Sequence, residues 1–406
     1  MNLSDFSSSA FYENPYPLYR ELREAGALVS LLPTLWITGR YPVTQALLRD
    51  KHVGRDFVHY LNTRYDEVTA AGPAFKVFTQ SVLMMNPPEH TVLRAKMAKA
   101  FGSRYTDKFT SLAENTTHGL IDGIYSKGET DLVAQYASQI PVVVICNLLG
   151  LDPEETRLFK QELWHLTAAI TKTLEIANIN YHDLAIANEG ALKLHDFFRN
   201  KLAQRRKVPG DDLISLFLSL DEALGMSDEE IISNVIFLFA AGHETSGNMI
   251  GNAIICLYRH PETLARIRDN PELLSQCVLE CLRHENSLQI AAREVLEDFH
   301  FEGHYLRRGD TVIVCLGAAN RDPVKFENPD DFLIDRPGLD ARELTSFGGG
   351  QHYCLGARLA FIEIKVALQT LLGRMPDLQI TNINELNWHK AHTLRGVQSL
   401  HGRWSV

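Results

Sequence analysis

The stretch SFGGGQHYCLGARLA, Ser346 to Ala360, places one cysteine in a glycine-rich loop that leads directly into a helical pattern. Glycine adopts backbone angles that are closed to other residues, so Gly348 to Gly350 allow several amides to converge on one atom. Here that atom is the sulfur of Cys354, and amide donors and a helix N-terminus both favour a thiolate. Gly356 leaves room for a flat ligand before the helix. The alternative is an inert cysteine in a flexible loop.

The composition excludes several classes of protein. The chain has 406 residues, 45% hydrophobic and 22% charged, which is typical of a globular protein. Its formal net charge of −10, with no basic block, argues against nucleic-acid binding. The N-terminus lacks the features of a signal peptide, and the longest apolar runs are too short to span a membrane. We therefore expect a soluble cytoplasmic protein, without nucleic-acid or membrane partners.

The cysteines are too scattered for a disulfide framework, and their spacing does not match a zinc site. Such a set fits a reducing compartment. The six are Cys146, Cys256, Cys277, Cys281, Cys315 and Cys354.

Helical periodicity dominates the chain. PYPLYRELREAG (15–26) predicts a helix closed by Gly26, and nearly every segment from 88 to 285 has helical spacing. LWITGRY (35–41) predicts a short strand followed by a helix. Strand character returns over 300–314, with a predicted hairpin turn at Gly309-Asp310, and the C-terminal stretch predicts a hairpin and loop. We expect one mainly α domain, residues 1–406, with a small β portion.

The cysteine loop resembles a known family. FGGGQHYCLG fits the pattern Phe-x-x-Gly-x-(His or Arg)-x-Cys-x-Gly, the haem-binding loop of the cytochrome P450 family. The resemblance implies that Cys354 is the thiolate ligand of a haem b iron, that Phe347 packs beside it, and that His352 reaches a propionate. It places Gly350 and Gly356 in the same cofactor-binding loop.

A second motif lies in IFLFAAGHETSGNMIGNAIICL (236–257), an apolar helical pattern that also contains an acid, a hydroxyl and glycines. Thr245 can donate its hydroxyl to the carbonyl of Ala241, which opens the helix locally and leaves room for a ligand and waters. A polar kink in a core helix is the alternative. The stretch resembles the family's Ala-Gly-x-(Asp or Glu)-Thr motif, which implies that Thr245 holds dioxygen and a proton-donating water while Glu244 relays protons.

A third motif, Glu280-x-x-Arg283, places opposite charges on one helix face. Most such pairs are surface pairs of little energetic value. The resemblance implies instead a buried pair that forms a network with Arg336, and we assign all three residues to the scaffold.

The stretch NPPEHTVLRAKMAKAFG (86–102) places His90 and Arg94 on one helix face, which suits an anion. It resembles the family's Pro-x-His-x-x-x-Arg pattern, and Arg293 resembles the remaining propionate arginine. With His352, four basic groups serve two propionates. The segment HENSLQIAA (284–292) departs from the family, which often has a proline there.

The resemblance implies a triangular-prism fold with haem b between the long distal helix and the cysteine loop. It implies a monooxygenase that inserts one atom of O2 into a substrate and receives electrons from a ferredoxin and its reductase. A basic docking patch of Lys96, Lys99, Arg104 and Arg358 is one interpretation, and ordinary solvated surface is the other. The functional alternatives are a peroxide-driven haem-thiolate enzyme and a non-catalytic relative that recruits carrier proteins.

By resemblance, residues 55–85, 160–190, 232–245, 285–292 and 390–397 line the substrate pocket. Their apolar side chains suit a lipophilic substrate, free or carrier-bound, such as a polyketide or peptide secondary metabolite, although they could equally form core. The residues singled out are Phe57, Tyr60, Leu61, Phe75, Phe78, Val82, Leu83, Met84, Leu166, Ile170, Leu174 and Ile176.

Overall fold

A computed structural model describes residues 2–102, 105–157, 159–160, 162–163, 166, 181–220 and 225–406. The chain forms two compact units. Unit 1 comprises Met1–Gly54, Asp107–Pro141 and Glu244–Val406, and unit 2 comprises Arg55–Thr106 and Val142–His243. Ile170, Leu174 and Ile176 of the expected pocket lie outside the described residues. The assignment of residues 1–406 to one domain stays a prediction.

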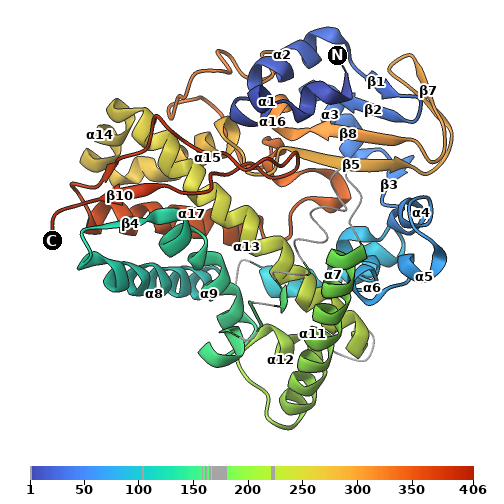
Figure 1. The fold of residues 1–406 in the computed structure, drawn as a ribbon, viewed down its shortest axis with the longest axis horizontal. Coiled ribbons are helices and arrows are strands. Elements are labelled where there is room, and N and C mark those ends of the chain that lie inside the picture. The colour runs from blue at the N-terminus through green and yellow to red at the C-terminus, as the bar shows by residue number, and fades with distance from the viewer. Residues whose placement is uncertain are drawn as a thin grey trace. The chain divides into compact units, whose positions relative to one another are not determined.

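Helices dominate both units, as the periodicity predicts (Figure 1). Those wholly or mostly in unit 1 are α1 (Ser9–Glu13), α2 (Tyr16–Ala25), α3 (Tyr41–Arg49), α8 (Thr106–Tyr125), α14 (Pro261–Asp269), α15 (Leu274–His284), α16 (Leu316–Ala319) and α17 (Ala357–Arg374). Those wholly or mostly in unit 2 are α4 (Phe57–Asn62), α5 (Glu67–Ala70), α6 (Pro73–Thr79), α7 (Glu89–Ala98), α9 (Gln139–Leu148), α11 (Tyr181–Lys207) and α12 (Leu213–Leu218). The long helix α13 (Asp228–Arg259) supplies residues to both units.

The strands belong to unit 1, where the larger sheet has the order β1-β2-β8-β5-β3. Strand β8 runs parallel to β2 and antiparallel to β5, so it is paired on both sides. Its sequence, TVIVC, is almost continuously apolar, as expected for a strand covered on both faces. The strands of this sheet are β1 (Val29–Leu32), β2 (Leu35–Thr38), β3 (Val53–Gly54), β5 (Ile290–Val295) and β8 (Thr311–Cys315). Smaller sheets pair β4 (Glu129–Asp131), β10 (His401–Arg403) and β9 (Gln379–Ile380), and β6 (Phe299–Phe301) with β7 (His304–Leu306).

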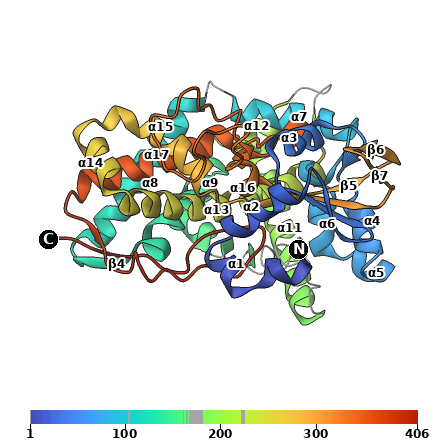
Figure 2. The ribbon, with the colours of Figure 1, turned by 90° about the horizontal axis from the view of Figure 1, so that it is seen from above.

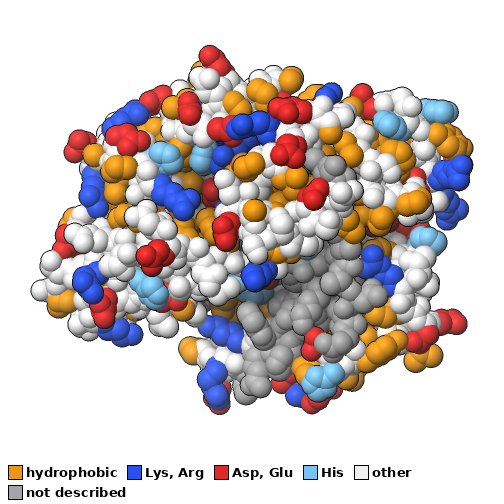
Figure 3. All heavy atoms as spheres, turned by 45° about the horizontal axis from the view of Figure 1, so that its top comes forward, with side chains coloured by type: hydrophobic (Ala, Val, Ile, Leu, Met, Phe, Trp, Pro, Cys, Tyr) orange, Lys and Arg blue, Asp and Glu red, His pale blue; other side chains and the backbone are white. Residues whose placement is uncertain are grey.

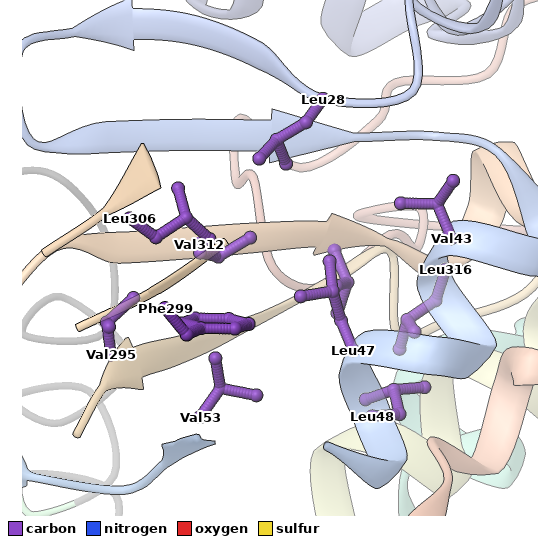
Figure 4. Close-up of a cluster of buried hydrophobic side chains, with 11 residues drawn as sticks. Leu28, Val43, Leu47, Leu48, Val53, Val295, Phe299, Leu306, Val312 and Leu316 are labelled. Atoms are coloured by element: carbon purple, nitrogen blue, oxygen red, sulfur yellow. The ribbon is translucent and has the colours of Figure 1, made fainter. Parts of the chain in front are cut away.

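Helix α3 packs its apolar face against this sheet. Figure 4 shows Leu47 and Leu48 of α3 beside Val312, Leu316 and Phe299, and all of these side chains are buried. The end of α3 is thereby fixed to the sheet, which matters because the cysteine loop rests on this helix end.

One expectation about strands needs correction, and one strand was not predicted. The hairpin of β6 and β7 turns at Glu302-Gly303, where both residues have positive φ, so a turn at Gly309-Asp310 was the wrong assignment. Strand β8 follows Gly309 but pairs with β2 and β5, not with β7. Strand β5 (Ile290–Val295) was also not foreseen. By contrast, the short strand expected within 35–41 is confirmed at Leu35–Thr38, and the helices on either side of it are confirmed at Tyr16–Ala25 and Tyr41–Arg49.

The expected buried charge network is confirmed at the C-terminal end of α15. Glu280 and Arg283 lie 2.7 Å apart, and both side chains are fully buried. Arg336 adds a second ion pair to Glu280 at 3.3 Å. Helix α15 also packs against α17, the helix that follows the cysteine loop (Figure 2).

The remaining donors of this network are bonded to backbone carbonyls. Arg283 donates to the carbonyls of Asn320 at 3.0 Å, Pro329 at 2.7 Å and Asp331 at 2.9 Å. Because the charges are paired and these donors are hydrogen-bonded, the pair can be buried without a large energetic cost. Loss of one partner would leave the other charge buried without a counter-charge.

We predict that Glu280→Ala lowers the free energy of unfolding by roughly 3–5 kcal/mol and yields little holoprotein, because Arg283 is left buried without its counter-charge. The matched control is Arg403→Ala, which breaks the exposed pair with Glu129 and should cost less than about 1 kcal/mol. Urea unfolding and haem content of both variants provide the measurement. Equal effects of the two substitutions would contradict a structural role for the buried pair.

Candidate functional site

The cysteine loop is closed by its own backbone. The amide of Cys354 donates to the carbonyl of Phe347 at 2.9 Å, and α17 begins three residues later at Ala357. Cys354 is exposed, whereas the other five cysteines are buried. Phe347 is buried and lies edge-on to Tyr353, 6.2 Å between ring centroids. The loop therefore presents a single accessible thiol in front of a helix N-terminus.

Two of the three loop glycines adopt backbone angles that are closed to most other residues, as expected from the sequence. Gly348 and Gly350 have φ of 70° and 63°, in the left-handed region, whereas Gly349 is extended. At Gly350 a β-carbon would lie 1.9 Å from the carbonyl oxygen of Leu48 at the end of α3. Glycine is thus required at 350 both for backbone angle and for space. At Gly356 a β-carbon would meet the Cys354 sulfur at 4.0 Å, an ordinary contact.

Asn320 connects the loop to the buried charge network. Its side-chain oxygen accepts from the amide and the hydroxyl of Thr345, both at 2.8 Å, and its side-chain nitrogen donates to Ser346 at 2.8 Å. Its backbone carbonyl accepts from Arg283. The start of the cysteine loop is therefore held by a fully buried amide that is itself fixed by the Glu280–Arg283 pair.

Helix α13 carries the expected distal motif within a long helix, as the periodicity predicts. Glu244 and Thr245 are half-buried, and Ala241 is exposed. The backbone is α-helical from Asp228 to Arg259. The local opening between Ala241 and Thr245 stays a prediction. Burial raises the pKa of Glu244 above its usual range.

The residues after Thr245 hold α13 against its neighbours in unit 1. Ser246 is buried and hydrogen-bonds Glu363 of α17. A β-carbon at Gly247 would lie 3.2 Å from the Cα of Ser138, so the backbones of two segments come close there. Thr245 is thereby fixed relative to the helix that follows Cys354.

Glu363 was missed by the sequence reasoning. It is buried, and burial raises its pKa from 4.5 to about 8, with the hydrogen bond to Ser246 acting in the opposite direction. A carboxyl near pKa 8 is mostly protonated at neutral pH. The available signal was a single acid in the apolar run LAFIEIKVAL (359–368).

The four expected propionate groups are divided between the units. His90 is buried on α7 of unit 2, and burial, together with the charge of Arg94, lowers its pKa. Arg94 is half-buried on the same helix. In unit 1, Arg293 is buried in β5 and donates to the carbonyl of Ala292, and His352 is half-buried in the cysteine loop. Their roles toward a cofactor stay predictions.

The proposed basic docking patch needs correction. Lys96 is buried, and its ammonium donates to the carbonyl of Gly225 at 2.7 Å, so it is not available on the surface. Lys96 was expected at the surface, but its ammonium is held by the backbone at Gly225. Arg104 lies outside the described residues, while Lys99 and Arg358 are exposed.

Comparison with known proteins identifies the family. Residues 33–375 match the sequence profile of the family described as Cytochrome P450. The chain belongs to the cytochrome P450 family. P450s of this family are haem-thiolate monooxygenases, and the mainly helical fold with small sheets is confirmed. No helix within the described ranges has the length and apolar character needed to cross a membrane.

Three relatives illustrate the likeness of this P450. Cytochrome P450 133B2 of Xylella fastidiosa (strain 9a5c) is 40% identical over 401 residues, 98% of each chain. The polyketide biosynthesis cytochrome P450 PksS of Bacillus subtilis (strain 168) is 30% identical over 404 residues, 96% of each chain. The crystal structure of P450BioI with an acyl carrier protein bearing hexadec-9Z-enoic acid superimposes with a TM-score of 0.89 at 31% identity. That superposition covers 98% of this chain and 99% of the other.

We predict that Glu363 makes the stability of this P450 fall as pH rises from about 5 to 8. Over that range the unfolded carboxyl is ionised while the folded one keeps its proton, so the folded state binds more protons. Glu363→Gln should remove a slope of up to about 1.4 kcal/mol per pH unit, measured by urea unfolding at several pH values. Ser246→Ala should extend the slope to higher pH. Parallel pH profiles for the wild type and Glu363→Gln would contradict the prediction.

Proposed function

We propose that this P450 inserts one oxygen atom from O2 into an extended apolar acyl chain that is carried as a thioester on a carrier protein. The observation that carries its haem-thiolate chemistry is the exposed thiol of Cys354 on a closed loop in front of α17. The acyl and carrier parts rest on the relatives, one of which binds an acyl carrier protein and one of which serves polyketide biosynthesis. A peptide metabolite is the other outcome that the sequence left open.

The residues present fit a haem. The accessible sulfur is a soft anionic donor, and a thiolate in this position is favoured by the N-terminus of α17. Gly356 adds no side chain beside the sulfur, and Phe347 is buried at the start of the loop. We infer that Cys354 is the iron ligand, with Phe347, Gly350 and Gly356 shaping the loop around it.

A haem held by a cysteine thiolate supplies the cleavage of the O–O bond, because the thiolate donates electron density. The chain's own contribution on the other side is proton delivery. We infer that the hydroxyl of Thr245 holds a proton-donating water. We assign the proton relay to Glu244, whose burial-raised pKa brings it closer to neutral pH. Ala241 supplies the exposed small side chain one turn before Thr245.

The basic residues would neutralise the propionates. His90 and Arg94 share one face of α7, and Arg293 and His352 supply two more donors from unit 1. Charge-assisted hydrogen bonds of this kind are stronger than neutral ones, so they suit a buried anionic edge.

We infer that electrons reach this P450 from a ferredoxin and its reductase. Of the basic residues expected to form a docking patch, Lys96 is buried. Among the described residues of that patch, Lys99 and Arg358 are exposed. Figure 3 shows basic and acidic side chains interspersed on one face. Local pairing, and not long-range attraction, would therefore orient an acidic partner on a chain of net charge −10.

Two alternatives have specific tests. A peroxide-driven enzyme does not need the proton relay, and the presence of both Glu244 and Thr245 favours the O2 pathway. A non-catalytic recruiting protein does not need Cys354. The variants below address each alternative in turn.

We predict that Cys354→Ser loses the red-shifted carbon monoxide band of thiolate-ligated haem, because a serine hydroxyl is not a soft anionic ligand. The difference spectrum of the reduced protein is the measurement. Cys315→Ser, at a buried thiol in β8, is the control and should keep the band. A full band in Cys354→Ser would show that another residue holds the iron.

We predict that Thr245→Ala binds haem and substrate normally but forms less product per reducing equivalent and more hydrogen peroxide. The reason is that the proton-donating water loses its anchor while electron supply is unchanged. Product and peroxide are assayed together. Thr245→Ser restores the hydroxyl and should restore coupling. Unchanged coupling in Thr245→Ala would remove Thr245 from the proton path.

We predict that a C16 acyl chain on an acyl carrier protein shifts the haem Soret band at a lower concentration than the same free fatty acid. The carrier adds contacts that the free chain lacks. Titration of both forms, with the unacylated carrier as control, provides the measurement. Tighter binding of a peptide substrate than of either acyl form would replace the acyl assignment.

A further inference from the structure

Two segments that are far apart in the sequence form one antiparallel pair in unit 1. The amide of Gln289 donates to the carbonyl of Thr393 at 2.8 Å, and the amide of Arg395 donates to the carbonyl of Ser287 at 2.7 Å. Leu288 and Leu394 lie directly opposite each other between these bonds. In such a pair the two side chains lie close together on one face. Both segments belong to those expected to line the substrate pocket.

A buried ion pair locks these two segments together. Glu285 and Arg395 lie 2.6 Å apart, with side chains 7% and 8% exposed. The guanidinium of Arg395 also covers the ring of Trp388 at 3.6 Å. The hydroxyl of Tyr16 donates to Glu285 at 2.8 Å. The ion pair therefore joins the residue that follows Leu394 to the residue three positions before Leu288.

The Glu285–Arg395 ion pair, called the clamp from here on, also has its two backbone carbonyls hydrogen-bonded to α13. The side-chain nitrogen of Asn252 donates to the carbonyl of Glu285 at 3.2 Å and to the carbonyl of Arg395 at 3.0 Å. Asn252 lies about two helical turns after Thr245. The segments are thus positioned relative to the helix that carries the proposed proton path.

The clamp also accounts for the missing proline. Where the family often has a proline, the chain reads HENSLQIAA, and its path is set by hydrogen bonds instead. Asn286 donates to the carbonyl of Leu288, and Gln289 donates to the carbonyl of Asn286. The carbonyl of Gln289 accepts from the amide of Gly317 at 3.1 Å. Side chains and ion pairing here replace the rigidity that a proline ring would supply.

We propose that Glu285 and Arg395 are positioning residues that hold Leu288 and Leu394 as one wall of the substrate cavity and so set which ligand shapes fit beside the haem. This proposal rests on the proposed function, because it takes the two segments as pocket lining. Removal of either charge leaves the other buried without its ion-pair partner. Arg395 would keep its bonds to the carbonyls of Tyr12 and Glu13, and Glu285 would keep the bond from Tyr16, so we expect the two segments to loosen where the ion pair joins them. The side chains of Leu288 and Leu394 are then no longer held in one position.

Two iron-binding probes of different size test the proposal, imidazole and 4-phenylimidazole. Both are titrated by the Soret shift into the holoprotein of the wild type, Glu285→Gln and Arg395→Gln. We expect the ratio of the two dissociation constants to change roughly fivefold or more in both variants, because a displaced apolar wall alters the phenyl contact most. Hydrogen exchange at the amides of Gln289 and Arg395 should become faster in Glu285→Gln.

The matched control is Glu155→Gln, which breaks the ion pair between Glu155 and Lys201 in unit 2, 2.8 Å long and also partly buried. It should leave the ratio within about twofold of the wild type. If Glu285→Gln loses thermal stability but keeps the wild-type ratio and slow exchange, the pair is structural only and the proposal is overturned.

Leu288→Ala keeps the test decisive if Arg395→Gln does not retain haem. This variant should weaken 4-phenylimidazole binding without a comparable change for imidazole. An unchanged ratio in Leu288→Ala would overturn the placement of the wall. Because both probes bind the iron whatever the natural substrate is, failure of the acyl-chain titration would overturn the proposed substrate and leave this test standing.

Discussion

The fully buried pair of Glu280 and Arg283 is the constraint on which the cysteine loop depends. Two buried charges must be paired, and their remaining donors and acceptors must be hydrogen-bonded. Here Glu280 also pairs with Arg336, and Arg283 donates to three backbone carbonyls. One of those carbonyls belongs to Asn320, whose side chain holds the start of the loop. The start of the loop that carries Cys354 is therefore connected, through Asn320, to an ion pair on a different helix.

Helix α13 is held within unit 1 by the same kind of polar contact. Ser246 meets Glu363 of α17, and Asn252 meets the clamp of Glu285 and Arg395. Thr245 precedes both contacts along α13, so the position of its hydroxyl is fixed by residues that come after it in the helix. Buried polar groups in this unit thus hold in place both Cys354, which is exposed, and Thr245, which is half-buried.

Local patterns predicted the residues whose identity is fixed by spacing, namely Cys354 in its loop and the pair Glu280–Arg283. They failed where distant segments decide the outcome. Lys96 was a candidate surface residue but is buried and bonded to the carbonyl of Gly225. Gly309-Asp310 resembles a hairpin turn, although β8 pairs with β2 and β5. The joining of residues 287–289 to 393–395 has no local signal, because it depends on pairing across about a hundred residues.

The carbon monoxide difference spectrum of Asn320→Ala tests the central claim most directly. This variant keeps the Glu280–Arg283 pair and the backbone carbonyl that accepts from Arg283, but it removes the side-chain bonds to Thr345 and Ser346. If the ion pair positions Cys354 through Asn320, the folded variant should show a reduced thiolate band with a corresponding gain of haem that lacks the thiolate. A wild-type thiolate band in folded Asn320→Ala would contradict the account.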